Sequence, residues 1–110
     1  MKGIPHSEVN PRTVEIHEGL PGGGLPNREH FDGGSLITID IMLGASEEFE
    51  GGQFRTLECD GTMKTIEFDQ GDALVFMSHK MHCVEVIKRG RRKVLVMEFW
   101  VSHLLSFEVI

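Results

Sequence analysis

The residues best placed to do chemistry together are His30 and Asp32, which lie two positions apart, and His82, far downstream. On a β-strand, residues i and i+2 point to the same face, so the imidazole and the carboxylate would project side by side. Two histidines and one carboxylate on one face of an octahedral ion leave three positions open, and this is the ligand set of many non-haem Fe(II) centres. The sequence therefore predicts a metal site made by His30, Asp32 and His82.

His79 competes with His82 as the distal ligand, because the two lie only three positions apart and would face opposite ways on a strand. Arg92 favours His82, since it follows His82 by ten residues in an H-x7-G-x-R segment. We therefore take His82 as the ligand and expect His79 to cap the preceding turn. The H-x-D pair, the distal histidine and the following arginine are together far more specific than any one of them.

These motifs, in this order, resemble the 2-oxoglutarate- and Fe(II)-dependent dioxygenases, and within them the prolyl 4-hydroxylase-like branch. The resemblance runs from about residue 12 to residue 100 and includes the segments 37–43, 49–54 and 70–76. It implies Fe(II), 2-oxoglutarate as cosubstrate and O2, with ascorbate as an optional addition. It also implies hydroxylation of an unactivated C–H bond in a peptidyl or small-molecule acceptor, coupled to decarboxylation of 2-oxoglutarate to succinate.

The resemblance assigns Arg92 and Thr38 to the cosubstrate. Arg92 would bind the distal carboxylate, which its guanidinium fork matches in geometry, and Thr38 would hydrogen-bond the same group. Family members often add a tyrosine from the first strand, whereas this chain contains no tyrosine and has Ile16 or His17 near the aligned position. One lost hydrogen bond costs about 1–3 kcal/mol, so we expect weaker 2-oxoglutarate binding without loss of function.

Alternating polar and apolar residues between turn signals predict about eight short strands and no confident helix. A short strand would carry His30 and Asp32, and the others would span residues 12–18, 35–43, 53–58, 63–68, 73–77, 81–87 and 92–101. Asp60-Gly61 is a strong hairpin signal, and residues 88–91 should close a last hairpin. This pattern predicts an all-β jelly roll, the double-stranded β-helix that the resemblance also implies. Residues 1–11 should be irregular, and residues 102–110 fit either a strand or a short helix.

The clearest strand, 35–43, has two different faces. Its parity places isoleucines and Leu43 on one face, and Thr38, Asp40 and Met42 on the other. An apolar face and a functional face suit the wall of a barrel. Family members usually carry helices that cover one sheet. Here we expect either that a partner chain or a second copy covers that face, or that the chain is a minimal or truncated copy of the family fold.

Length and composition limit the number of domains and the class of protein. The 110 residues suit one domain, with its core at about 12–101, and 40% hydrophobic and 25% charged residues are ordinary for a globular protein. A net charge of −6 without a basic face argues against a nucleic-acid partner. No apolar run reaches the roughly 18 residues of a spanning helix, and no secretory signal is visible, so we expect a cytoplasmic protein without a membrane partner.

Two other functional interpretations remain open. The chain could be a catalytically weak or inactive jelly-roll domain that binds metal or a partner, which the absent tyrosine and absent helical cover favour. It could also be a cupin-like metalloprotein with another chemistry, although cupin sites generally use more histidines and do not explain Arg92.

Overall fold

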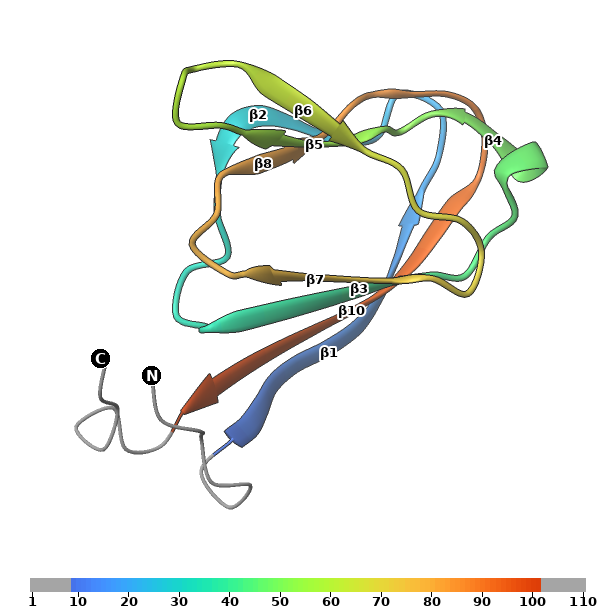
Figure 1. The fold of residues 1–110 in the computed structure, drawn as a ribbon. Coiled ribbons are helices and arrows are strands. Elements are labelled where there is room, and N and C mark those ends of the chain that lie inside the picture. The colour runs from blue at the N-terminus through green and yellow to red at the C-terminus, as the bar shows by residue number, and fades with distance from the viewer. Residues whose placement is uncertain (1–8, 102–110) are drawn as a thin grey trace.

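The protein is described by a computed structural model in which residues 9–101 are placed. The expectation for residues 102–110 lies outside this range, as does most of the expected irregular lead. Two four-stranded antiparallel sheets face each other, as Figure 1 shows, and a two-stranded sheet joins them at one end. The major sheet has the order β1 (Val9–Gly19), β10 (Arg92–Val101), β3 (Ile37–Met42) and β7 (Ala73–Met77). The minor sheet has the order β2 (Leu25–His30), β8 (His82–Val84), β5 (Phe54–Leu57) and β6 (Met63–Ile66). β4 (Phe49–Gly51) pairs with β9 (Ile87–Gly90), and one 3-10 turn, η2 (Ser46–Glu48), precedes β4.

The chain passes back and forth between the two main sheets, which makes the fold a jelly roll and confirms the predicted fold class. β10 is one of the two central strands of the major sheet: it pairs with β1 from end to end and with β3 from Val94 to Phe99. The Asp60-Gly61 turn joins β5 to β6, as expected, and Gly61 adopts the positive φ that such a turn requires. The first strand begins at Val9, so residues 9–11 are extended and not irregular.

The predicted last hairpin is wrong. β8 belongs to the minor sheet, β9 pairs with β4, and β10 pairs with β1 and β3. The basic segment 88–91 lies against the acidic segment 47–50. Arg89 Nε lies 3.4 Å from Glu50 Oε2, and the backbone N–H of Arg91 donates to the carbonyl of Glu48. As a result His82 and Arg92 start strands of opposite sheets and face the same interior.

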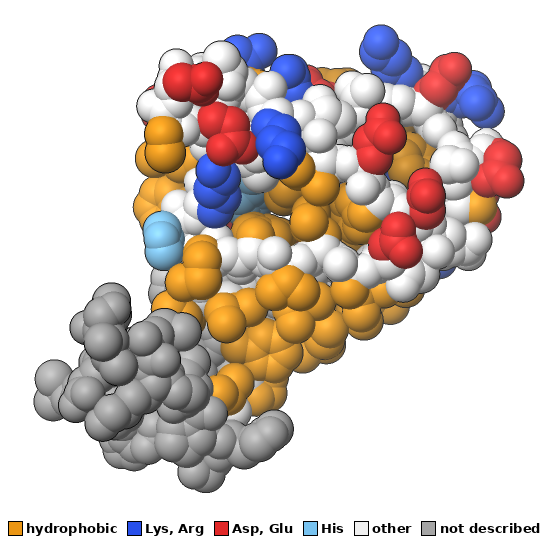
Figure 2. All heavy atoms as spheres, in the orientation of Figure 1, with side chains coloured by type: hydrophobic (Ala, Val, Ile, Leu, Met, Phe, Trp, Pro, Cys, Tyr) orange, Lys and Arg blue, Asp and Glu red, His pale blue; other side chains and the backbone are white. Residues whose placement is uncertain are grey.

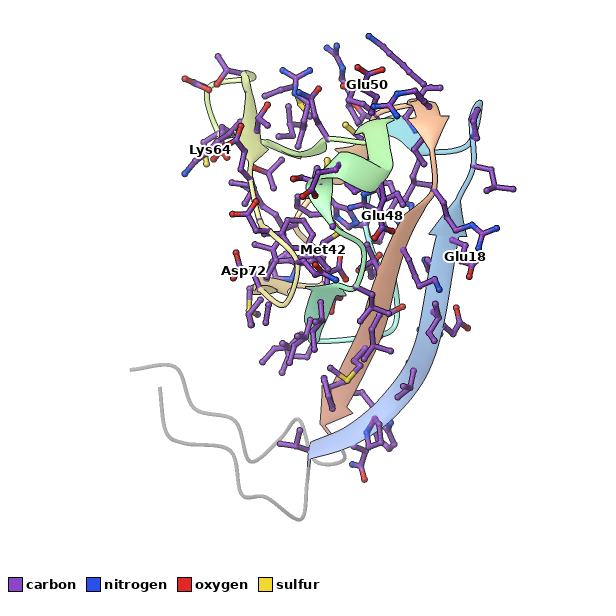
Figure 3. The ribbon with its side chains drawn as sticks, turned by 90° about the vertical axis from the view of Figure 1, so that its right-hand side faces the viewer. Glu18, Met42, Glu48, Glu50, Lys64 and Asp72 are labelled. Carbon is purple, nitrogen blue, oxygen red and sulfur yellow. The ribbon has the colours of Figure 1, made fainter. Side chains whose placement is uncertain are left out.

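The two faces of β3 separate as its parity predicted. Thr38, Asp40 and Met42 are buried between the sheets, whereas the three isoleucines are half-buried on the outer face. In Figure 3, which views one end of the molecule, Met42 lies between the sheets and Lys64 lies at the periphery. The interior therefore contains the face of β3 that carries polar groups.

The outer face of the major sheet is apolar and exposed in the part of the chain that the structure describes. Val14, Ile16 and Val75 are 60%, 61% and 60% exposed, and Figure 2 shows hydrophobic side chains gathered along this lower side of the molecule. That a partner chain or second copy covers this face stays a prediction.

The interior contains about as many buried polar side chains as buried apolar ones, and these buried polar side chains indicate where a functional site lies. Among residues 9–101, the buried apolar side chains are Met42, Phe54, Cys83, Ile87 and Val94, and the buried polar ones are Thr38, Asp40, Thr56, Ser78, His82 and Arg92. Buried polar groups are costly unless they are paired or bind a ligand. No helix within the described range is long and apolar enough to cross a membrane.

Candidate metal centre and the cavity beside it

His30, Asp32 and His82 come together at one end of the interior. One candidate ligand atom from each lies within 4.8 Å of the others. His30 Nε2 is 3.1 Å from Asp32 Oδ1, and His82 Nε2 is 3.6 Å from the same oxygen. Ligand atoms at right angles about an ion at about 2.1 Å would be about 3.0 Å apart, so this cluster is close to what one metal ion requires.

The backbone positions the three side chains in a way the sequence only partly anticipated. His30 and His82 are direct cross-strand partners on the adjacent strands β2 and β8, so both histidines come from the minor sheet. Asp32 lies beyond the end of β2, not on it, because the chain leaves the minor sheet there toward β3. Its backbone N–H donates to the carbonyl of Ser78, at 2.8 Å, and this bond fixes the crossing.

A buried hydroxyl pair orients the Asp32 carboxylate. Thr38 Oγ1 donates to Asp32 Oδ2 at 2.7 Å and lies 2.9 Å from Ser78 Oγ, and both hydroxyl residues are fully buried. Oδ1 is thereby turned toward the histidines. Thr38 is not among the residues that line the cavity described below, so its contact with 2-oxoglutarate stays a prediction. In the structure Thr38 supports the carboxylate of Asp32.

His82 is held in one tautomer and in a dry setting. Its Nδ1 lies 2.8 Å from the carbonyl of Lys80, and because a carbonyl can only accept, Nδ1 carries the proton and Nε2 presents a lone pair. Phe54 stacks on the imidazole and Phe76 contacts it edge-on, with ring centroids at 5.3 and 4.9 Å. Burial lowers the pKa of His82, against the opposing effects of the Lys80 bond and of Asp32, and so favours the neutral, metal-binding form.

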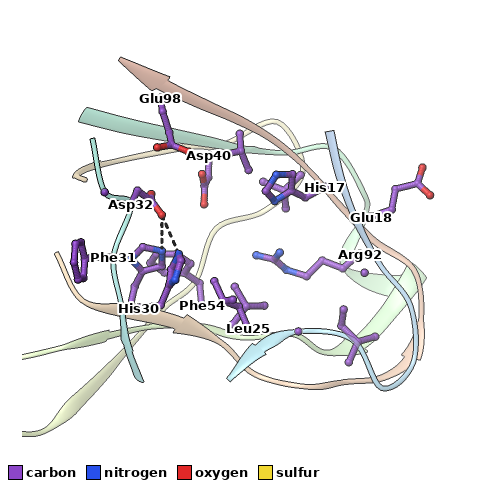
Figure 4. A pocket seen from close by; sticks show the side chains of 18 of the residues that line it. His17, Glu18, Leu25, His30, Phe31, Asp32, Asp40, Phe54, Arg92 and Glu98 are labelled. Carbon is purple, nitrogen blue, oxygen red and sulfur yellow. Dashed lines mark hydrogen bonds and ion pairs between the residues drawn. The ribbon is translucent and has the colours of Figure 1, made fainter. Parts of the chain in front are cut away.

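A cavity of about 610 Å³ opens from this cluster into the interior. Figure 4 shows His30 and Asp32 on one side of it and the Arg92 guanidinium entering from the other, with Asp40 on the wall between them. The arm of Arg92 passes close to Gly52, where an added Cβ would lie 2.8 Å from its Cδ. Arg92 pairs with Gly19 of β1, and its side chain lines the same cavity as the triad.

Asp40 and Arg92 carry unpartnered buried atoms. Asp40 Oδ1 and Arg92 Nε have no hydrogen-bond partner, and the two residues are only 8% and 7% exposed. Burial raises the pKa of Asp40 from 3.8 to about 6, although the positive charge of Arg92 acts in the opposite direction. Burial also lowers the pKa of Arg92, which Asp40 opposes. This unpartnered donor and acceptor are therefore free to pair with a polar ligand in the cavity.

Asp40 is the functional candidate that the sequence reasoning did not assign. A carboxylate within a β-branched strand, on the face opposite the isoleucines, was the available signal. Ile16 and His17 are the two candidates for the first-strand position at which family members often have a tyrosine. Ile16 lies on the exposed outer face, whereas His17 lines the cavity. His17 Nε2 lies 2.9 Å from Glu15 Oε2.

The mouth of the cavity is charged and partly apolar. Glu98 accepts a hydrogen bond from Ser35 and lies 3.6 Å from Arg12 Nη1, and both charged residues line the cavity. Phe31, which is 51% exposed, lines the cavity as well.

No protein-family model matches the sequence, and no curated protein sequence matches it. Solved structures do match. An oxidoreductase of the 2OG-Fe(II) oxygenase family from Burkholderia pseudomallei is similar over 84% of this chain, with a TM-score of 0.74 and 21% identity. A prolyl-4-hydroxylase from Pseudomonas putida is similar over 80% of it, with a TM-score of 0.67 and 21% identity. An RmlC-like cupin protein from Desulfovibrio desulfuricans aligns over 89% of this chain at 16% identity, with a TM-score of only 0.48.

The first two similarities establish the fold: this chain has the double-stranded β-helix of those two structures. It spans 45% and 51% of their lengths, so about half of each has no counterpart here.

Proposed function

We propose that this chain is the core of a 2-oxoglutarate- and Fe(II)-dependent dioxygenase of the prolyl 4-hydroxylase-like branch. It would hydroxylate an unactivated C–H bond while 2-oxoglutarate is converted to succinate and CO2. One observation carries the proposal: two histidines and a carboxylate converge at one side of a cavity into which a buried arginine projects from the other. The fold shared with the two oxygenase structures supports it.

His30, Asp32 and His82 would hold Fe(II), which supplies the redox chemistry toward O2 when it is bound. The chain's own part is to orient and to exclude water. The Lys80 carbonyl fixes the lone pair of His82, and Thr38 fixes the carboxylate of Asp32. Because three coordination positions would remain open, the cosubstrate and O2 can share the ion.

Arg92 would bind the distal carboxylate of 2-oxoglutarate. Its guanidinium is buried, its Nε has no partner, and its fork matches a carboxylate bidentately. The chain has no tyrosine for the same carboxylate, and the first-strand side chains that line the cavity are Arg12, His17 and Glu18. The weaker cosubstrate affinity expected from the sequence stays part of the proposal.

The acceptor would enter at the mouth formed by Arg12, Phe31 and Glu98. A peptidyl or small-molecule acceptor fits this mixed charged and apolar opening, and a cytoplasmic location stays a prediction.

A catalytically weak or inactive jelly-roll domain is the second candidate. One observation favours it: a buried carboxylate, Asp40, lines the space that an anionic cosubstrate would occupy.

Succinate release tests the two candidates. The purified chain is incubated with Fe(II), 2-oxoglutarate and O2, and succinate is measured for wild type, His82→Ala and His79→Ala. The dioxygenase proposal predicts Fe(II)-dependent succinate from wild type and from His79→Ala, whose side chain is exposed, and none from His82→Ala. Fe(II) binding without any succinate would favour the inactive domain, and turnover that survives His82→Ala would contradict the proposed ligand set.

A further inference from the structure

Asp40 faces the cavity at a place where an ionised carboxylate is hard to reconcile with an anionic ligand. It is buried on β3, its Oδ1 is unpartnered, and it lies on the cavity wall between Asp32 and Arg92 (Figure 4). 2-Oxoglutarate at neutral pH offers only hydrogen-bond acceptors. Arg92 can satisfy such a ligand, whereas an ionised Asp40, which also only accepts, would repel it.

The other charged groups around Asp40 do not remove this conflict. Arg92 and His17 favour its ionised form, whereas Asp32 and Glu98 disfavour it. Arg92 is the one buried positive charge among them, and in the proposed function it is engaged by the cosubstrate. An anion placed in the cavity therefore adds negative charge near Asp40 while competing for its counterion.

We propose that Asp40 binds the cosubstrate in its neutral form, donating its O–H to a carboxylate of 2-oxoglutarate, so that binding at neutral pH takes up a proton. This inference rests on the proposed function, because it assumes that 2-oxoglutarate fills the cavity. The burial that already raises the pKa of Asp40 toward neutrality in the free protein makes the neutral form accessible. Asp40 is then a residue that determines cosubstrate affinity and its dependence on pH.

The consequence is a linkage between pH and affinity. If one proton is taken up on Asp40, the dissociation constant of 2-oxoglutarate rises by up to about tenfold per pH unit above about pH 6. The carboxyl groups of the free cosubstrate stay ionised over this range and contribute no such change. Asparagine at this position has no charge and keeps an N–H donor, so Asp40→Asn should bind 2-oxoglutarate more tightly than wild type at pH 8.

The test is calorimetric titration of 2-oxoglutarate into the anaerobic Fe(II)-loaded protein at pH 6, 7 and 8, in buffers of different ionisation enthalpy. The protons taken up by wild type are measured directly, so the result does not depend on any variant folding. We expect proton uptake approaching one near pH 7.5 in wild type. Asp40→Asn should lack that uptake and show a nearly flat pH profile, and Glu67→Gln, which removes an exposed carboxylate, should behave as wild type.

Three outcomes would overturn the inference, and they separate it from the proposed function. If 2-oxoglutarate binds to wild type without proton uptake, or if Asp40→Asn binds it more weakly at pH 8, Asp40 is not a neutral donor, yet the proposed function stands. If 2-oxoglutarate binds to neither protein at any pH while Fe(II) does, both the inference and the cosubstrate of the proposed function fail.

Discussion

Replacing Asp40 with asparagine should stabilise the metal-free protein at pH 8 and have a smaller effect at pH 5. The carboxyl is 8% exposed, and its burial raises its pKa from 3.8 to about 6 in the folded chain. Because the folded pKa lies above the unfolded one, the favourable contribution is complete only below about pH 3.8 and is lost as the pH rises through about 6. Asparagine does not titrate, so the variant escapes this loss.

The size of the effect follows from the two pKa values. The full titration corresponds to about 3 kcal/mol at about 1.36 kcal/mol per pH unit, and about 1.4 kcal/mol of it falls between pH 5 and pH 8. The advantage of Asp40→Asn over wild type should therefore grow by about 1.4 kcal/mol across that interval.

Urea denaturation of the metal-free protein at both pH values measures this difference. Glu67→Gln is the matched control, since it removes a carboxylate that is exposed, and it should not reproduce the advantage of Asp40→Asn. An advantage of Asp40→Asn that is equal at pH 5 and pH 8, or a variant less stable than wild type at pH 8, would refute the assignment of Asp40 as a destabilised buried carboxyl.

Two further substitutions test the supporting contacts. Thr38→Val removes the 2.7 Å hydrogen bond to Asp32 at similar side-chain volume, so Fe(II) affinity should fall by about 10- to 100-fold in an anaerobic titration. Thr38→Ser keeps the hydroxyl and should retain the wild-type Fe(II) affinity. Equal Fe(II) affinities for Thr38→Val and wild type would contradict the role of Thr38 in orienting Asp32. Gly52→Ala places a Cβ 2.8 Å from the arm of Arg92, so calorimetry should show weaker 2-oxoglutarate binding with Fe(II) binding little changed. Gly61→Ala shares the positive φ but meets no atom within 4 Å, and an equal loss in that control would point to backbone strain alone.

Much of the fold could be predicted because local signals carried it. The period-two alternation of β3 identified which of its residues face inward, and Asp60-Gly61 identified the β5–β6 hairpin. The hairpin expected around Gly90 was wrong because a glycine after basic residues predicts a turn but does not predict which strands the flanking segments pair with. In the structure β9 lies against β4, where an added Cβ on Gly90 would clash with the carbonyl of Glu48.

The site shows the same division. His30 and Asp32 are two positions apart in the sequence, so their proximity could be predicted from local geometry. The ten-residue spacing between His82 and Arg92 identified the third metal ligand and the arginine. The partners that hold Asp32, namely Thr38 and Ser78, could not be found this way, since they come from two further segments. Asp40 was predicted to share the face of Thr38, but its significance depends on its distance from a charge in another strand, which no local pattern records.

The central claim is that one cavity holds Fe(II) on His30, Asp32 and His82 and 2-oxoglutarate on Arg92. The most direct measurement is anaerobic titration of Fe(II) in the presence of 2-oxoglutarate, followed by the weak visible charge-transfer band that the family resemblance implies. We predict a band in wild type and in His79→Ala, a weaker one in Arg92→Ala, and none in His82→Ala. Soluble, folded wild type that gives no band, or a band that His82→Ala leaves unchanged, would contradict the claim.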